Sequence, residues 1–141
     1  MKLMKSFIAL ALIGMAAGAN VPTRGIKIIA NLEVDASEIS RDELSRIFLM
    51  TKTSLPKASH VEPVLEKSGP VHDVFIREYM GRTEAALMTY YRSLVFTGKA
   101  SIPKTFNSDP EVAEYVARTK GAIGYVSASA STPGVKTLTI K

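Results

Sequence analysis

The stretch LEKSGPVHDVF, from Leu65 to Phe75, contains the residues best suited to bind a ligand. Ser68 and Gly69 form a turn, Pro70 follows, and an amphipathic run then begins. A loop that enters a helix in this way presents free backbone N–H groups, which hold anions. Glycine lets the backbone approach a ligand closely, and a serine hydroxyl can donate a hydrogen bond to it. The alternative is that Ser68 only caps the helix.

Some charged side chains are expected to favour anion binding at this turn, and one is expected to oppose it. Lys52 and Arg77 are candidates to supply positive potential that supports an anion. Glu66 lies before Ser68 and repels an anion if its side chain points inward. Pro70 lacks an N–H group that a ligand would use. The turn therefore has the frame of an anion site, with some of its elements missing.

Histidines offer little support for a metal site or an enzyme. His60 and His72 are the only 2 in the chain, and there is no cysteine. Their spacing matches no metal-binding motif, and a lone histidine near a helix start is expected to be solvated. Ser68, His72 and Asp73 have the residue types of a hydrolase, but a Gly-x-Ser-x-Gly motif is absent and the histidine shares a helical turn with the serine. We predict no catalytic residue, no metal and no cofactor.

The N-terminus has the pattern of a secretory signal peptide. A basic start and an apolar run precede a cleavage site of small residues, Ala17-Gly18-Ala19. The apolar run is shorter than the roughly 20 residues that span a membrane. We therefore expect residues 1–19 to be removed. Residues 20–141 would then form one periplasmic domain that does not span the membrane.

Charge and composition exclude some classes of partner. The net charge is +5, and it falls to +3 without Lys2 and Lys5, which leaves 16 basic against 13 acidic residues. The basic residues are scattered along the chain, whereas nucleic-acid binding favours a basic patch interleaved with aromatic residues. The absence of cysteine excludes disulfides, so the domain depends on a buried core. We expect no nucleic-acid partner.

Strand-like and helix-like segments alternate along the chain, which predicts an α/β fold. Apolar and β-branched runs predict strands at 26–30, 61–65, 122–129 and 135–141. Start and stop signals predict helices at 40–50, 70–81, 83–98 and 108–121. Pro63 places the second strand at a sheet edge, or itself at the start of that strand.

Several of these segments resemble the periplasmic phosphate-binding proteins of ABC transporters. The matching segments are ISRDELSRIFLM (39–50), VEPV (61–64), SGPVHDVF (68–75) and GAIGYV (121–126). The resemblance covers nearly all of residues 20–141 and is greatest to short, single-lobe members of the family. It implies a single type II periplasmic-binding-protein-like lobe, with a mixed β-sheet flanked by helices.

The same resemblance implies a ligand and shows where this chain departs from the family. Full-length members clamp phosphate between two lobes with Ser and Thr side chains, backbone N–H groups, an Arg and an Asp. Ser68 and Gly69 match the Ser-Gly of that phosphate loop, but Pro70 replaces its threonine. Leu65 and Glu66 stand where its arginine would be. These losses, and the single lobe, predict weak phosphate binding by the monomer; a dimer would be one way to rebuild the cleft.

Two functions remain open from the sequence. The first is an exported, non-enzymatic substrate-binding-protein-like domain, which binds phosphate or another small oxyanion and serves ABC-type phosphate transport. The second is a periplasmic interaction module that has lost ligand binding and contacts a membrane transporter or an envelope protein. The altered loop and the missing lobe motivate the second function, whereas saturable anion binding would favour the first.

Overall fold

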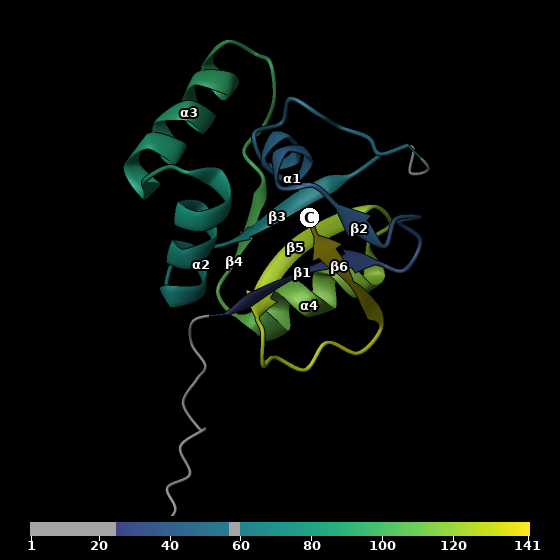
Figure 1. Ribbon diagram of the computed structural model, residues 1–141. Coiled ribbons are helices and arrows are strands. Elements are labelled where there is room, and N and C mark those ends of the chain that lie inside the picture. Colours follow the sequence, from purple (N-terminus) through teal and green to yellow (C-terminus); the bar gives the residue numbers. More distant parts are fainter. Residues whose placement is uncertain (1–24, 57–59) are drawn as a thin grey trace, which may run out of the picture.

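The computed structural model describes residues 25–56 and 60–141, and the expected signal peptide at 1–19 lies outside these ranges. Its centre is a six-stranded mixed sheet with the order β2-β6-β1-β5-β3-β4 (Figure 1). The strands are β1 (Ile26–Asn31), β2 (Glu38–Ile39), β3 (Glu62–Glu66), β4 (Lys104–Phe106), β5 (Ala122–Ser127) and β6 (Val135–Ile140). The helices are α1 (Arg41–Phe48), α2 (Pro70–Phe75), the π-helical η3 (Ile76–Met80), α3 (Glu84–Phe96) and α4 (Asp109–Arg118).

The sheet contains both antiparallel and parallel strand pairs. β1 runs antiparallel to both β5 and β6, whereas β3 runs parallel to β4 and to β5. β2 pairs in parallel with β6 at the other edge. The sheet is therefore mixed and flanked by helices, as the sequence predicts.

Different helices cover the two faces of the sheet (Figure 1). α4 packs on one face, against buried residues that include Ile29 and Val64. α1, α2 and η3 pack on the other face, where the adjacent residues Ile28 and Leu65 join a larger core. Successive side chains of a strand point to opposite faces, so neighbouring apolar residues fill both cores. This explains why the strands of the sheet centre are almost continuously apolar.

The four predicted strands and four predicted helices are all present, with small changes of boundary. The predicted helix at 70–81 consists of α2 and η3, and Gly81 ends it in the left-handed conformation with φ 63°. The short strands β2 and β4 were not predicted. They contain 2 and 3 residues, too few to show a periodic pattern.

The prediction that Pro63 marks an edge strand is wrong, whereas its place near the strand start is confirmed. β3 lies between β5 and β4 in the sheet. The N–H of Glu62 donates to the carbonyl of Gly121 on the β5 side, at 2.8 Å. The next nitrogen, of Pro63, therefore faces the β4 side, where pairing begins only at Val64 and Lys104. The missing N–H of Pro63 removes no bond to β4.

Serine and threonine caps begin three of the helices. The hydroxyls of Ser40, Thr83 and Ser108 accept the backbone N–H three residues later, at the starts of α1, α3 and α4. Ser40 is followed three residues later by Glu43, a pattern that predicts a reciprocal bond from the Ser40 N–H to the Glu43 side chain; this bond is absent from the hydrogen bonds of the described residues. Glu43 lies 3.5 Å from Lys52 instead.

α3 is attached to α1 by its tyrosines. The hydroxyls of Tyr90 and Tyr91 donate to the carbonyls of Leu49 and Phe48, both at 2.6 Å. These carbonyls lie at the C-terminus of α1, where helical partners are missing. Across residues 25–56 and 60–141, no helix combines the length and apolar character needed to cross a bilayer.

Gly124 is required by the close approach of α4 to β5. A Cβ atom at this position would lie 2.8 Å from Cγ1 of Val112 and 3.0 Å from Cγ2 of Val64. We predict that Gly124→Ala lowers the free energy of unfolding by about 1–3 kcal/mol through overpacking. Urea denaturation measures this change. In a Val112→Ala background the same substitution should cost less, and an equal cost in both backgrounds would contradict the steric explanation.

Candidate functional site

Three parallel strands finish side by side at the same end of the sheet. β4, β3 and β5 are neighbours that run parallel, and they end at Phe106, Glu66 and Ser127. In open α/β sheets the loops at this end form the ligand crevice. The Ser68-Gly69 turn is one of these loops, since it follows β3 directly.

The turn itself differs from a simple helix cap. The N-cap of α2 is Gly69, with φ 110° and no capping bond from a side chain, so the interpretation of Ser68 as the N-cap is wrong. Ser68 is exposed. Within the described residues, no acceptor is bonded to the backbone N–H of Ser68 or Gly69. A positive φ favours glycine, and the turn therefore presents free N–H groups beside an exposed hydroxyl.

Two carboxyl groups lie behind this turn. Glu66 is 6% exposed, and its Oε2 has no conventional hydrogen-bond partner; the same is true of Oδ1 of Asp109. Burial raises the pKa of Glu66 from 4.5 to about 8, helped by a hydrogen bond to Asp109 and by the charge of that carboxylate. One shared proton would satisfy both unpartnered oxygens, since a protonated carboxyl is a donor.

The environment of Asp109 indicates which group holds the proton. The other oxygen of Asp109, Oδ2, accepts the backbone N–H of Ser127 at 3.1 Å. Asp109 is also the first residue of α4, where the helix dipole favours a negative charge. We therefore place the charge on Asp109 and the proton on Glu66. This reduces the negative charge behind the turn from two units to one.

His72 is buried rather than solvated, contrary to the sequence expectation. It is 2% exposed, and its Nδ1 lies 2.5 Å from the hydroxyl of Tyr125. That hydroxyl accepts the backbone N–H of Glu66 at 2.9 Å, so its own proton is donated to Nδ1. The proton of a neutral His72 therefore lies on Nε2, which is 2.5 Å from Oε2 of Glu84. Burial raises the pKa of Tyr125, which keeps the hydroxyl protonated.

The two proposed supporting charges lie away from the turn. Lys52 lines a pocket beside Glu62, at the opposite end of β3. Arg77 is exposed on η3, roughly 10 Å along the helix from Gly69. Lys67 is exposed and directly precedes Ser68, so it is a nearer source of positive charge. Lys67 is not among the supporting charges predicted from the sequence, although its adjacency to the turn is a usable signal.

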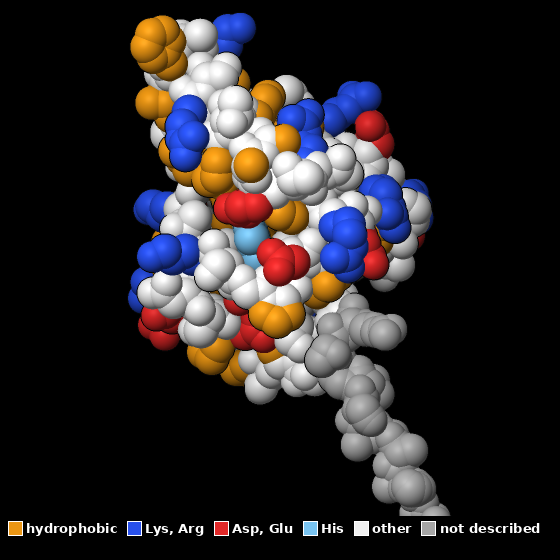
Figure 2. Space-filling view, turned by 90° about the vertical axis from the view of Figure 1, so that its left-hand side faces the viewer, with side chains coloured by type: hydrophobic (Ala, Val, Ile, Leu, Met, Phe, Trp, Pro, Cys, Tyr) orange, Lys and Arg blue, Asp and Glu red, His pale blue; other side chains and the backbone are white. Residues whose placement is uncertain are grey.

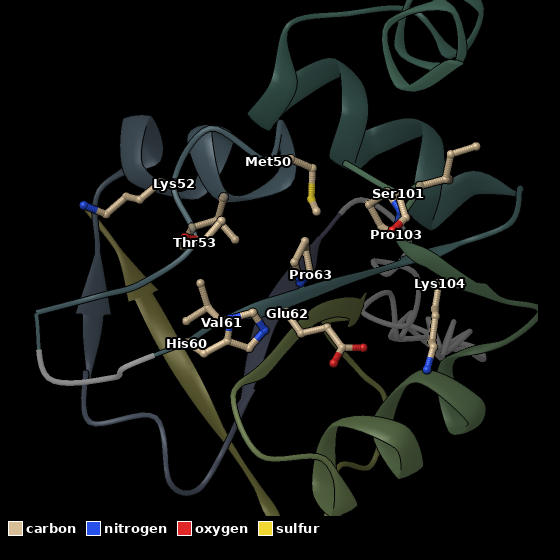
Figure 3. A pocket seen from close by; sticks show the side chains of 12 residues that line it. Met50, Lys52, Thr53, His60, Val61, Glu62, Pro63, Ser101, Pro103 and Lys104 are labelled. Carbon is tan, nitrogen blue, oxygen red and sulfur yellow. The ribbon is translucent and has the colours of Figure 1, made fainter. Parts of the chain in front are cut away.

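The pocket beside Lys52 encloses about 230 Å³ (Figure 3). Met50 points toward Pro63 on its apolar side, and His60 and Glu62 lie below them. Ser68 and Gly69 do not line it. Across the part of the chain described, no three His, Cys, Asp or Glu side chains come together as metal ligands.

The structure thus defines a fold class: a mixed α/β sheet flanked by helices, with loops gathered at the carboxyl ends of three parallel strands. Comparison with solved structures confirms the predicted resemblance at the level of the fold. An ABC-type phosphate transport receptor from Vibrio cholerae matches with a TM-score of 0.62 and 17% identity, over 82% of this chain and 46% of the receptor. PstS from Borrelia burgdorferi matches with a TM-score of 0.62 and 13% identity, over 82% of this chain and 47% of that protein.

A third match is a Clostridium perfringens protein named as a phosphate ABC transporter substrate-binding protein and solved with bound phosphate. Its TM-score is 0.63 at 17% identity, over 82% of this chain and 44% of the other. The chain thus spans less than half the length of each of these proteins. No protein-family model matches the chain, and no curated protein matches it by sequence.

The raised pKa of Glu66 makes stability depend on pH. Between pH 4.5 and about 8 the folded Glu66 retains a proton that the unfolded chain has lost. Its stabilising contribution is therefore complete below pH 4.5 and is lost as the pH rises through about 8. We predict that the free energy of unfolding falls between about pH 5 and about pH 9, and that Glu66→Gln flattens this slope. Denaturant unfolding at several pH values measures it.

The control for this experiment is Glu114→Gln, because Glu114 is an exposed glutamate of α4. This variant should retain the slope of the unmodified protein. A slope that persists in Glu66→Gln would show that other groups cause the pH dependence.

The hydroxyl of Tyr125 provides a second test. Tyr125→Phe leaves the N–H of Glu66 and Nδ1 of His72 without their buried partner, while the aromatic ring is kept. We predict a loss of about 1–3 kcal/mol in the free energy of unfolding. Tyr79→Phe is the control, since both rings stack on Phe75 but no described residue bonds the Tyr79 hydroxyl. Equal losses in the two variants would refute the role assigned to the Tyr125 hydroxyl.

Proposed function

We propose that this chain is an exported, non-enzymatic substrate-binding-protein-like domain of the periplasm, which binds phosphate or a similar small oxyanion for ABC-type transport. The observation that carries this proposal is the position of the Ser68-Gly69 turn. It lies at the carboxyl ends of parallel strands and has free backbone N–H groups. Two of the three neighbours, those from Vibrio cholerae and Clostridium perfringens, are phosphate transport proteins by name, which agrees with this choice of ligand class.

The state of Glu66 removes an objection to anion binding. A buried, ionised glutamate two residues before Ser68 would repel an anion. Since the pKa of Glu66 is raised to about 8, the group is mostly neutral at pH 7. The remaining charge on Asp109 is offset locally by the N–H of Ser127 and by the N-terminus of α4.

Ser68 and Gly69 are the ligand-binding residues of this proposal. The Ser68 hydroxyl donates one hydrogen bond to the oxyanion, and the backbone of Gly69 approaches it without a side chain between them. Lys67 supplies charge beside the turn, and Arg77 and Lys52 act only at longer range. A site with these few contacts binds phosphate weakly, because Pro70, Leu65 and Glu66 stand where the resemblance implies a threonine and an arginine that would add contacts.

The second candidate function is an interaction module that contacts a transporter or an envelope protein without a ligand. The observation that favours it is the altered loop: Pro70 stands where the resemblance implies a threonine, and Leu65 and Glu66 stand where it implies an arginine. A domain that has lost these ligand contacts retains surfaces for partners even if it loses the ligand.

Calorimetric titration with phosphate, with sulfate for comparison, distinguishes the two functions. We predict saturable binding of phosphate that weakens in Ser68→Ala by about tenfold to a hundredfold, the loss of one hydrogen bond to a charged group. Ser101→Ala is the matched control, because Ser101 is an exposed serine that lines the pocket at the other end of β3. Its affinity should equal that of the unmodified protein. Absence of heat with either anion would favour the interaction module.

A further inference from the structure

The C-terminal half of α3 is poorly covered by the rest of the protein. Leu87 and Tyr91, one and two turns into the helix, are fully buried, whereas the last two residues, Val95 and Phe96, are 49% and 91% exposed. Figure 1 shows α3 projecting at the side of the molecule away from β1 and β6. The helix is thus anchored at its beginning and extends its final turn into solvent.

The last two residues of α3 form an exposed apolar pair. Four large apolar side chains are exposed in the described residues, and two of them, Val95 and Phe96, are neighbours here. The N–H groups of Lys99 and Ala100 both donate to the carbonyl of Leu94, which folds the chain back onto the last turn of the helix. We call Val95 and Phe96, with the basic residues described next, the α3 tip.

The charges around these residues are of one sign. Arg92 precedes Phe96 by four residues, which places it on the same side of the helix, and Lys99 follows in the turn. Both are exposed, and neither forms an ion pair with another described residue. No Asp or Glu occurs between Glu84 and Asp109. Figure 2 shows an apolar group with blue side chains beside it at the top of the molecule.

We propose that the α3 tip is a docking surface for an anionic lipid membrane. An exposed aromatic side chain with an aliphatic neighbour inserts into the headgroup region, and flanking Arg and Lys residues bind anionic lipids. Charge complementarity therefore selects a negatively charged partner. The tip is a projection rather than a groove, and a lipid surface accepts a projection without a complementary cavity. Docking at this site would hold the binding lobe beside a membrane.

A single tryptophan can report on this site. The chain contains no tryptophan, so Phe96→Trp introduces a unique fluorophore at the most exposed apolar position. With vesicles of equimolar phosphatidylcholine and phosphatidylglycerol, we expect its emission to shift to shorter wavelength and its quenching by acrylamide to fall several-fold. Vesicles of phosphatidylcholine alone should produce little change. Because the signal comes only from residue 96, attachment through the apolar N-terminal segment does not by itself produce it.

Leu32→Trp is the matched control, because Leu32 is 61% exposed and lies in the turn after β1. Its emission should not change with either type of vesicle. An equal shift at both positions, or no shift at position 96, would overturn the proposal. Protection of position 96 that grows with protein concentration in the absence of lipid would also overturn it, since a second copy of the chain would then cover the tip.

The basic residues provide an independent measurement. In the Phe96→Trp background, Arg92→Gln and Lys99→Gln should each lower the apparent affinity for the anionic vesicles about fivefold. Arg118→Gln removes an exposed charge on α4, on the other face of the sheet, and should leave the affinity unchanged. Equal effects of all three substitutions would indicate attraction by net charge alone and would contradict docking through the α3 tip.

Discussion

The contacts of the buried Tyr125 side chain hold the centre of the fold together. Its ring stacks on Phe75 with the centroids 3.9 Å apart, which fixes α2 on β5. Its hydroxyl accepts the N–H of Glu66 and donates to His72, and His72 in turn contacts Glu84 at the start of α3. One residue thus joins two strands and two helices. The N–H of Glu66, the hydroxyl of Tyr125 and both ring nitrogens of His72 each have a partner, which avoids the cost of burying these groups unsatisfied.

The candidate anion site is built on this arrangement. The bond from Glu66 to Tyr125 fixes the end of β3, from which the Ser68-Gly69 turn emerges. On the other side Asp109 accepts the N–H of Ser127, and with burial it raises the pKa of Glu66, so β3, β5 and α4 meet behind the turn. The raised pKa of Glu66 lowers the negative charge where an anion would approach. The stability of this end of the sheet and the electrostatics of the turn therefore both depend on Glu66.

Two parts of the protein surface carry different chemical groups. The turn at the carboxyl ends of the parallel strands presents N–H groups, whereas the α3 tip presents apolar and basic side chains. These two surfaces belong to separate elements, since the turn precedes α2 and the tip ends α3. Ligand binding and attachment to a surface can therefore change independently in this protein. Loss of the ligand at the turn would therefore leave the α3 tip unchanged, and the reverse also holds.

The α/β class, the four principal strands and the main helices can be predicted from the amino-acid sequence, because apolar periodicity and capping residues such as Ser40 and Ser108 act over a few neighbouring positions. The Ser68-Gly69 turn can be located in the same way, since the glycine needed there is a local requirement. The burial of His72, the raised pKa of Glu66 beside Asp109 and the exposure of Phe96 follow only from the folded arrangement. These properties depend on contacts between residues distant in the chain, and no local pattern encodes which of them become neighbours.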